Sequence, residues 1–402
     1  MKDGPLSVWL IAGEESGDQL GASLMRGLTE ATGGAVRYAG VGGDRMVAHG
    51  MEVLFPLADI AVNGLSDIIR HLPGLIARIN RAAEAVIAAR PDVLVIIDAP
   101  DFTHRVAARV RAAAPEIPIV NYVSPTVWAW RPGRARKMAA YIDHVLALFP
   151  FEPAVHARLG GPPCTYVGHP LLEKLPVLRP GPGERSAFGA APPVLLMLPG
   201  SRRGEIRRHM QPFGAALAEV TRQLGPVEAI LPAVSHLRPA IEAALADWPV
   251  KPTVVVGEAE KFAAFRRAHG AIAASGTVTL ELALAGVPSI VAYRLDTPYR
   301  IVKWINGVIP IITASTMVLA NIVLGENALP ELLDDQVTPE ALAGAVGPFL
   351  SDTPVRRALL EKLDRIDRVM ALPDGRTPSA AAAEVVLRVI AEGAGAPRLP
   401  AR

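Results

Sequence analysis

The chain has 402 residues, enough for two or three domains of ordinary size, and half of its residues are apolar while 5% are aromatic. A formal charge of +2 gives no overall attraction to nucleic acid, and a single cysteine, Cys164, excludes an internal disulfide framework and argues against a cysteine zinc cluster. No secretory pattern opens the sequence, because the apolar run 6–12 is short and leads into polar residues, so we expect a cytoplasmic protein.

The first part of the chain alternates short apolar runs with helical stretches. The runs predicted to be strands are 6–12, 36–41, 93–97, 117–123 and 145–149. The helices predicted between them are 19–29, 76–89 and 102–114. Strands that are apolar throughout are buried on both faces, so this alternation predicts a parallel sheet covered by helices on either side.

A segment rich in proline and glycine, 176–193, is a candidate linker, and the same pattern restarts after it. The strands predicted there are 194–198, 229–231, 253–256, 271–274 and 289–293. The predicted helices are 206–224, 277–285, 339–350, 354–370 and 380–392. The fold class is therefore α/β, with two units whose ligands are expected in a cleft, at the carboxyl ends of the strands.

Two apolar segments raise the question of a membrane. The stretch 304–325 is uncharged and long enough to span a bilayer, but Pro310 and Asn321 are among several interruptions that favour buried or interfacial structure. The stretch 62–79 has apolar residues at helical spacing, which fits either a helix lying on a membrane or, more commonly, a helix facing the core. Its apolar stripe contains Val62, Leu65, Ile68, Ile69, Leu72 and Leu75.

Two motifs of the second half are suited to a phosphate group. Ser275-Gly276-Thr277 follows a strand and opens a helix, whose free N–H groups and partial positive charge favour a diphosphate. Glu281 lies one turn later on the same face, where a carboxylate could bind ribose hydroxyls. Ser201 and Arg202 follow another strand, and the arginine could neutralise phosphate charge. Ordinary turns with helix caps remain an equal alternative for both motifs.

A carboxylate at the carboxyl end of the strand 93–97 is placed for catalysis. Asp98 has no structural duty that the sequence reveals, so it is the candidate general base, accepting a proton from an attacking hydroxyl. Asp101 is better placed to cap the next helix. The choice between the two carboxylates stays open.

Further polar segments follow other strands. Glycine-rich turns at 13–18 and 41–43 could bind a sugar or phosphate, although neither has the spacing of a phosphate-binding loop with a lysine. The segment 124–137 interleaves two tryptophans with basic residues, which fits a phosphate-bearing lipid, a membrane surface, simple packing or, least well, nucleic acid. No histidine, cysteine and carboxylate set has metal-ligand spacing, so no metal is expected.

Together these segments resemble the lipid-A-disaccharide synthase family. The matching pieces, in order along most of the chain, are GEESGD at 13–18, DAPDF at 98–102, YVSPTVWAWR at 122–131, LPGSRRGEI at 198–206, SGTVTLE at 275–281 and NIVLGENALPELL at 321–333. The resemblance implies a GT-B fold of two Rossmann-like domains facing a central cleft. It implies transfer of 2,3-diacylglucosamine from its UDP derivative to 2,3-diacylglucosamine 1-phosphate, with inversion and without metal or cofactor.

The resemblance also implies domains and roles. An acceptor domain would span 1–172 and a UDP-sugar domain 173–370, while 371–402 would hold a helix crossing back to the first domain. The residues expected around UDP are Ser201, Arg202, Ser275, Gly276, Thr277, Glu281 and Asn321. Those expected around the acceptor are Glu14, Ser16, Asp18, Gly43, Ser124, Trp128 and Arg131, with Asp98 as base and Arg202 also assisting catalysis. Glu15, Asp44 and Ala320 depart from the family pattern, which weakens fine claims about the acceptor loops.

The resemblance places the protein on the cytoplasmic side of the inner membrane, bound peripherally through the apolar stripe at 62–75. No nucleic acid partner is expected, and the oligomeric state stays open, with a homodimer as one candidate. Two alternatives stay open: another GT-B enzyme that uses UDP-GlcNAc, such as an epimerase or a peptidoglycan glycosyltransferase, and a non-catalytic protein that binds lipids or nucleotide sugars at the membrane.

Overall fold

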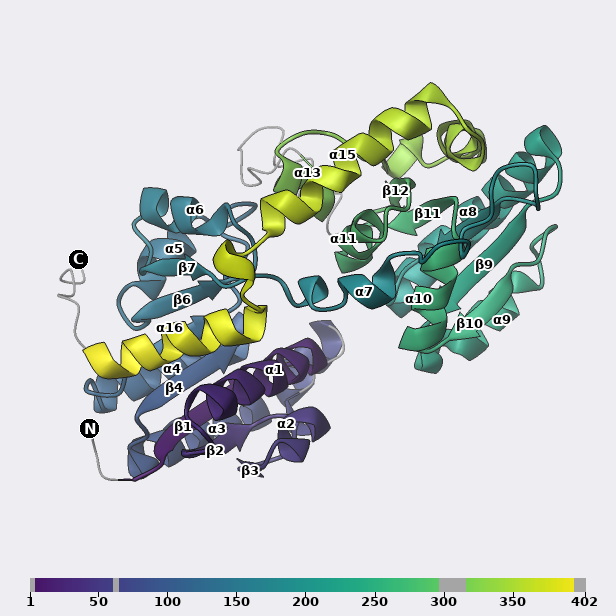
Figure 1. The fold of residues 1–402 in the computed structure, drawn as a ribbon. Coiled ribbons are helices and arrows are strands. Elements are labelled where there is room, and N and C mark those ends of the chain that lie inside the picture. Colours follow the sequence, from purple (N-terminus) through teal and green to yellow (C-terminus); the bar gives the residue numbers. More distant parts are fainter. Residues whose placement is uncertain (1–3, 61–64, 296–315, 394–402) are drawn as a thin grey trace. The chain divides into compact units, whose positions relative to one another are not determined.

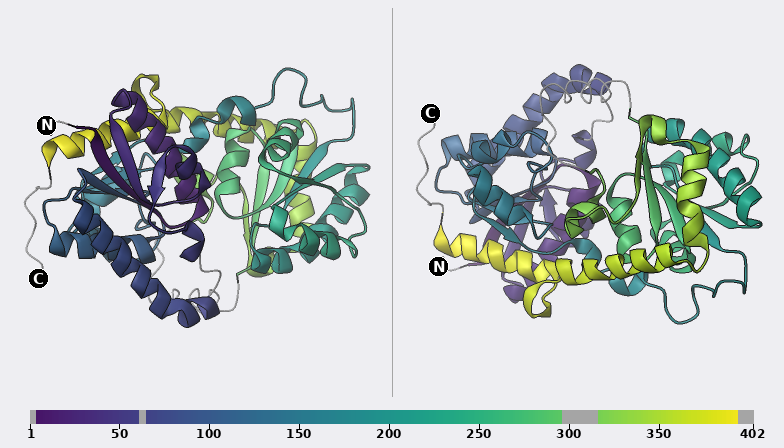
Figure 2. Two further views of the ribbon diagram at one scale, coloured as in Figure 1. Left: turned by 90° about the horizontal axis from the view of Figure 1, so that it is seen from below. Right: turned by 90° about the horizontal axis from the view of Figure 1, so that it is seen from above.

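A computed structural model of the chain describes residues 4–60, 65–295 and 316–393. The chain divides into two compact units (Figure 1). Unit 1 contains Met1–Pro170 and Ala371–Arg402, and unit 2 contains Leu171–Met370. Each unit is built on a parallel sheet with helices on both faces, which confirms the predicted α/β class (Figure 2).

Unit 1 has a seven-stranded sheet in the order β3-β2-β1-β4-β5-β6-β7. All of its described strand pairs are parallel. The strands are β1 (Leu6–Ala12), β2 (Val36–Val41), β3 (Met51–Val53), β4 (Val93–Ile97), β5 (Ile119–Tyr122), β6 (His144–Ala147) and β7 (Cys164–Tyr166). The strands predicted at 6–12, 36–41 and 93–97 are confirmed to the residue. The short β3 and β7, which pair only at the sheet edges, were not predicted.

The apolar runs of unit 1 are buried because successive side chains enter two different cores. In β1, Val8 and Leu10 belong to one apolar cluster, whereas Trp9 and Ile11 belong to the cluster on the opposite face. The first cluster is closed by α1 and α16, and the second by α3, α4 and α5. The helices of unit 1 are α1 (Glu15–Ala31), α2 (Asp44–Ala48), α3 (Leu65–Ala89), α4 (Pro100–Ala113), α5 (Gly133–Met138), α6 (Glu152–Leu159) and α16 (Pro378–Glu392).

Helix α16 follows unit 2 in sequence but packs on α1 in unit 1 (Figure 1). The Thr377 hydroxyl caps it by accepting the N–H of Ala380. The two helices approach closely at Gly27, where a Cβ atom would lie 2.4 Å from the Ser379 carbonyl oxygen. Ala382 and Val386 of α16 are fully buried in the shared cluster, so this helix is part of the core of unit 1.

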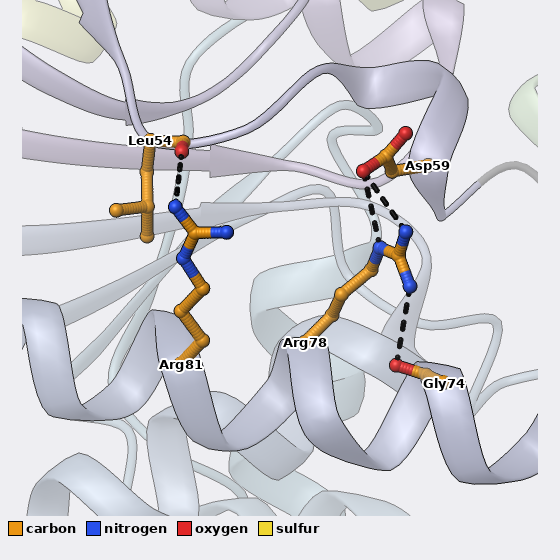
Figure 3. A network of polar contacts seen from close by, with 5 residues as sticks. All are labelled: Leu54, Asp59, Gly74, Arg78 and Arg81. Atoms are coloured by element: carbon orange, nitrogen blue, oxygen red, sulfur yellow. Dashed lines mark hydrogen bonds and ion pairs between the residues drawn. The ribbon is translucent and has the colours of Figure 1, made fainter.

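The described part of α3 is a core-facing helix. Ile79 is fully buried, and Leu75 packs partly against the same cluster. On the polar side, Arg78 forms an ion pair with Asp59 at 3.0 Å, and Arg81 donates to the Leu54 carbonyl at 3.3 Å (Figure 3). Nothing is described of the side chains of the other stripe residues that were predicted to meet a membrane. These residues are Val62, Leu65, Ile68, Ile69 and Leu72.

Unit 2 has a six-stranded sheet in the order β10-β9-β8-β11-β12-β13, and its described pairs are all parallel. The strands are β8 (Val194–Leu198), β9 (Glu228–Ala233), β10 (Thr253–Val256), β11 (Gly270–Ala274), β12 (Ser289–Tyr293) and β13 (Glu331–Leu333). The helices are α7 (Leu175–Leu178), α8 (Arg203–Leu224), α9 (Arg238–Leu245), α10 (Glu258–Arg267), α11 (Thr277–Leu284), α13 (Leu319–Leu324), α14 (Pro339–Val346) and α15 (Pro354–Met370).

The proline-rich segment 176–193 is attached to unit 2. Arg179 donates to the Leu284 carbonyl at 3.1 Å, and Arg185 donates to the Gly286 carbonyl at 2.8 Å. Two arginines thus neutralise the carbonyl end of α11 and fix the segment on the unit's surface. The predicted helix 339–350 was too long: α14 ends at Val346, and a 3-10 turn, Gly347–Leu350, follows where Pro348 interrupts the α-helical hydrogen bonds.

The uncharged stretch 304–325 is described only from residue 316 onward, where it contains the short helix α13. Within the described ranges, no helix is both long and apolar enough to cross a membrane.

Candidate functional site

Both sheets have the strand order of a doubly wound α/β fold. The chain leaves β1 toward β2 and β3, then returns to the other side of β1 with β4, and unit 2 repeats this around β8 and β11. The loops after the two central strands therefore diverge and leave a crevice at the carboxyl edge, where such folds bind ligands. In unit 1 the crevice lies between the ends of β1 and β4, and in unit 2 between the ends of β8 and β11.

Asp98 is the first residue after β4 and sits at the crevice of unit 1. Its carboxylate accepts the Ser16 hydroxyl at 3.3 Å and the Ala99 N–H at 2.8 Å. Asp98 and Ala99 both have positive φ angles, 54° and 43°, which non-glycine residues rarely adopt. The Thr103 hydroxyl holds this turn by donating to the Asp98 carbonyl at 2.7 Å. Strained backbone of this kind is concentrated at functional sites.

Gly13, the residue after β1, is required by the turn at Asp98. A Cβ atom on Gly13 would lie 2.0 Å from the Cβ of Ala99, and no side-chain rotation relieves that overlap. We expect Gly13→Ala to displace Ala99, destabilise unit 1 by about 1–3 kcal/mol and reduce turnover. Thermal unfolding measures the first effect, with Gly133→Ala as control, because a Cβ there meets no atom within 4 Å. Equal melting temperatures for the two variants would contradict this prediction.

The residues predicted around the acceptor follow β1, β2 and β5, on either side of Asp98 at the end of β4. Glu14 and Ser16 are exposed at the start of α1, beside Asp98. Asp18 is only 3% exposed, and its carboxylate accepts the backbone N–H groups of Gly43 at 2.8 Å and Met46 at 3.1 Å. This carboxylate caps α2 and so links α1 to the loop before α2, while the acceptor contact of Asp18 and Gly43 stays a prediction.

The segment 124–131 follows β5, next to β4 in the sheet. Ser124 is 4% exposed, and its hydroxyl lies 2.8 Å from Nε2 of His156. Trp128 is half-buried with its ring edge-on to Phe151, at 5.5 Å between ring centres. Arg131 is exposed, and its guanidinium lies 4.0 Å from the centre of the Trp130 ring. The segment thus offers an aromatic ring and a cation on the loop that follows the strand next to β4.

In unit 2, the crevice holds the free N-terminus of α11. Gly276 and Thr277 are exposed, and a Cβ atom on Gly276 would meet no atom within 4 Å, so a ligand can approach the backbone closely. Ser275 donates its hydroxyl to the Met317 carbonyl at 2.9 Å, which holds the approach to α13 beside this terminus. A diphosphate fits the partial positive charge of such a helix end.

Arg202 lies across the same crevice, after β8. Its side chain is 82% exposed and is therefore available to a ligand. The turn beneath it is fixed by Glu205, whose carboxylate accepts the N–H groups of Ser201 at 2.8 Å and Arg202 at 3.2 Å. Gly200 has a φ of 127°, and a Cβ there would lie 2.5 Å from the Glu205 side chain. The sequence therefore places an exposed cation on a rigid turn, where its guanidinium lies 3.7 Å from the Glu205 carboxylate.

A buried histidine that the sequence did not single out supports this turn. His209 is fully buried on α8, with Nδ1 2.8 Å from the Pro199 carbonyl and Nε2 accepting the N–H of Arg294 at 3.0 Å. These partners fix the neutral tautomer with the proton on Nδ1, and burial lowers the pKa of His209. The ring therefore ties the ends of β8 and β12 together without adding charge.

Two residues predicted to contact UDP have other partners. Glu281 on α11 accepts Lys261 of α10 at both oxygens, at 2.8 and 3.0 Å. Asn321 is 2% exposed, and its amide exchanges two hydrogen bonds with the backbone of Leu329, at 2.8 and 2.9 Å. Asn321 therefore holds the loop after α13, and its contact with UDP stays a prediction. Lys261 was missed because nothing in its local sequence marks it.

An apolar groove of about 810 Å³ lies between α8 and α9 in unit 2. Ile206, Met210 and Trp248 line it, with Arg203 and Arg207 at one end. Among the described residues, no group of three histidine, cysteine, aspartate or glutamate side chains is arranged to hold a metal ion.

Comparison with known proteins shows the family. Residues 8–370 match the model of the lipid-A-disaccharide synthetase family. A lipid-A-disaccharide synthase of Rhodopseudomonas palustris is 54% identical over 97% of both chains, and one of Bradyrhizobium diazoefficiens is 49% identical over 98% of both. The chain belongs to the lipid-A-disaccharide synthase family. As the resemblance implied, it is a glycosyltransferase of lipid A synthesis.

Comparison with solved structures shows that this member of the lipid-A-disaccharide synthase family has the GT-B fold. The calicheamicin glycosyltransferase CalG4 matches with a TM-score of 0.60 and 18% identity, over 97% of this chain and 99% of that one. The Staphylococcus aureus MnaA–UDP structure matches with a TM-score of 0.61 and 11% identity, over 95% of both. At these identities the likeness concerns the fold alone.

Proposed function

We propose that the chain transfers 2,3-diacylglucosamine from its UDP derivative to the 6-hydroxyl of 2,3-diacylglucosamine 1-phosphate. The acceptor oxygen attacks the anomeric carbon, the bond to the UDP oxygen breaks, and the configuration inverts in this single displacement. The products are UDP and a β-1,6-linked disaccharide 1-phosphate. The shown family supports the reaction class, and the loops at the two crevices support the assignment of roles.

The observation that carries this proposal is the turn at Asp98. One oxygen of its carboxylate is fixed by the Ala99 N–H, while the other is held by a longer hydrogen bond from the exposed Ser16, at 3.3 Å. An acceptor hydroxyl can replace Ser16 at that second oxygen and give up its proton there as it attacks. Arg131 and the Trp128 ring, on the adjacent strand end, are suited to the acceptor phosphate and sugar.

In unit 2 we assign the UDP diphosphate to the N-terminus of α11 and to Arg202. Negative charge grows on the departing diphosphate, and donors already fixed in place stabilise that charge most effectively. Ribose binding by Glu281 would require its oxygens to be shared with Lys261. Two solved structures that share the fold, a Neisseria meningitidis UDP-GlcNAc 2-epimerase and Staphylococcus aureus MnaA, hold UDP-GlcNAc and UDP, which supports the choice of nucleotide. We further assign the protein to the cytoplasmic face of the inner membrane, as a peripheral homodimer.

An assay of the purified protein with UDP-2,3-diacylglucosamine and 2,3-diacylglucosamine 1-phosphate, with EDTA present, tests the proposal. We expect disaccharide 1-phosphate and UDP in equal amounts, and inversion is read from the anomeric proton coupling of the product. If a related synthase is active in the same mixture but this protein forms no product, the substrate assignment falls, and simpler UDP-sugars become the candidates.

A further inference from the structure

The segment 124–131 is held under backbone strain at both ends. Val123 has a φ of 78° and Arg131 a φ of 54°. Valine is branched at Cβ, so a positive φ is a genuine outlier for it, and backbone of this kind is strained. A conformation of this kind persists only where the surrounding structure fixes it. Asn121 contributes one contact, by donating its amide to the Val123 carbonyl at 3.1 Å.

Helix α6 supplies the main support through His156, which is fully buried. Its Nε2 lies 2.8 Å from the Ser124 hydroxyl, and that hydroxyl also donates to the Pro125 carbonyl at 3.0 Å. A hydroxyl has one proton, which Ser124 donates either to the Pro125 carbonyl or to the Glu152 carboxylate, and in both cases its oxygen accepts the Nε2–H of His156. The other ring nitrogen packs on Gly161, where a Cβ would lie 2.5 Å away. Burial lowers the pKa of His156, which keeps the ring neutral.

Glu152, one turn earlier on α6, supports the same segment. It is 2% exposed, and its carboxylate accepts the N–H groups of Leu148 and Phe149, each at 3.0 Å. Burial raises the pKa of Glu152 to about 7, while hydrogen bonds, including those from the side chains of Trp128 and Ser124, act against the rise. Glu152 and His156 are four residues apart, so they share one face of α6 and meet the segment together.

We propose that Glu152 and His156 are positioning residues, which hold the strained segment 124–131 so that Trp128 and Arg131 face the acceptor. The Asp98 N–H donates to the Tyr122 carbonyl at 3.1 Å, so the segment starts next to the proposed base. The acceptor role of the segment rests on the proposed function. Its support by α6 does not, and the two parts are tested separately.

The first experiment measures steady-state kinetics of His156→Phe, which keeps a ring but removes the hydrogen bond to Ser124. We expect the acceptor KM to rise about tenfold or more while the donor KM stays near its wild-type value, because a misplaced binding segment acts on one substrate only. His156→Gln places an N–H near the position of Nε2 and should recover most of the loss. Ser124→Ala removes the same hydrogen bond from the other end and should raise the acceptor KM in the same way. It replaces His156→Phe as the test if His156→Phe folds poorly.

His144→Phe is the matched control. His144 also bonds a hydroxyl, with Nε2 2.8 Å from Thr165, but it begins β6 and so lies at the edge opposite the segment. We expect it to lower the melting temperature without changing the acceptor KM. If His156→Phe and Ser124→Ala behave like His144→Phe, these residues only stabilise the fold and the proposal is overturned.

The second experiment does not depend on activity. Fluorotryptophan is incorporated and each fluorine resonance is assigned by single Trp→Phe changes. His156→Phe should shift or broaden the Trp128 and Trp130 resonances and leave Trp9 and Trp248 unchanged, while His144→Phe should leave these four of the five tryptophan resonances unchanged. An unmoved Trp128 resonance overturns the support by α6. If the Trp128 resonance shifts but the wild-type protein forms no disaccharide, the support of the segment by α6 stands and only the proposed function is refuted.

Discussion

Asp98→Asn is expected to lower kcat by about 10²- to 10⁴-fold, the range that a positioned general base contributes. Asparagine has the same shape and tolerates a positive φ, so the turn, at φ 54°, should survive. Its amide can still place an oxygen near the Ala99 N–H, but it cannot take the proton from an attacking hydroxyl. Single-turnover measurements with bound donor should show that the loss lies in the chemical step.

Asp101→Asn is the control for this experiment. Asp101 is the other carboxylate of the same turn, 90% exposed and 3.6 Å from Arg134, so it resembles Asp98 in sequence position but not in environment. An exposed ion pair of this kind contributes little to stability. We expect near-normal turnover and a near-normal melting temperature. A large loss in Asp101→Asn, with normal turnover in Asp98→Asn, would mean that the base is Asp101.

Arg202→Ala is expected to reduce kcat/KM by about 10²- to 10³-fold, the loss seen when one fixed donor to a developing negative charge is removed. The side chain is 82% exposed, so the fold should tolerate its removal. Arg202→Lys should recover only part of the loss, because an ammonium cannot reproduce two parallel hydrogen bonds to a phosphate.

Arg203→Ala is the matched control, because Arg203 is also exposed and directly adjacent but lies at the end of the groove between α8 and α9. Calorimetric titration with UDP separates binding from catalysis for both variants. Weakened UDP binding in Arg202→Ala alone supports the assignment. Equal losses in both variants would show a general effect of positive charge near the crevice.

The central strands could be predicted because each of them is a run of consecutive apolar residues. β1, β4 and β8 are apolar at every position or nearly so, since helices cover both faces of the sheet. The edge strands β3 and β7 have three residues each, too few for any periodicity to appear. Asp98, Arg202 and Ser275 followed from the central strands, because a strand end fixes where the next side chains lie.

The partners of the side chains could not be predicted in the same way. Asp18 binds backbone groups that are 25 to 28 residues away, and Lys261 binds a carboxylate 20 residues away. Neither pair lies within one helix or one turn, so only the fold brings the groups together. Even a nearby partner could not be predicted for Asn321. Its amide binds Leu329, only eight residues away, but the sequence does not reveal the path of the loop between them.

The position of α16 has a consequence for synthesis on the ribosome. Unit 1 is begun first, yet Leu24, Met25 and Leu28 of α1 lack their covering helix until the residues of unit 2 have been translated. At about 10 residues per second, that delay is roughly 20 s. Unit 2 is contiguous in sequence, so it can complete its core within that interval. During the interval the nascent chain exposes an apolar helix face that chaperones recognise, and a message truncated before residue 378 would leave that face permanently uncovered.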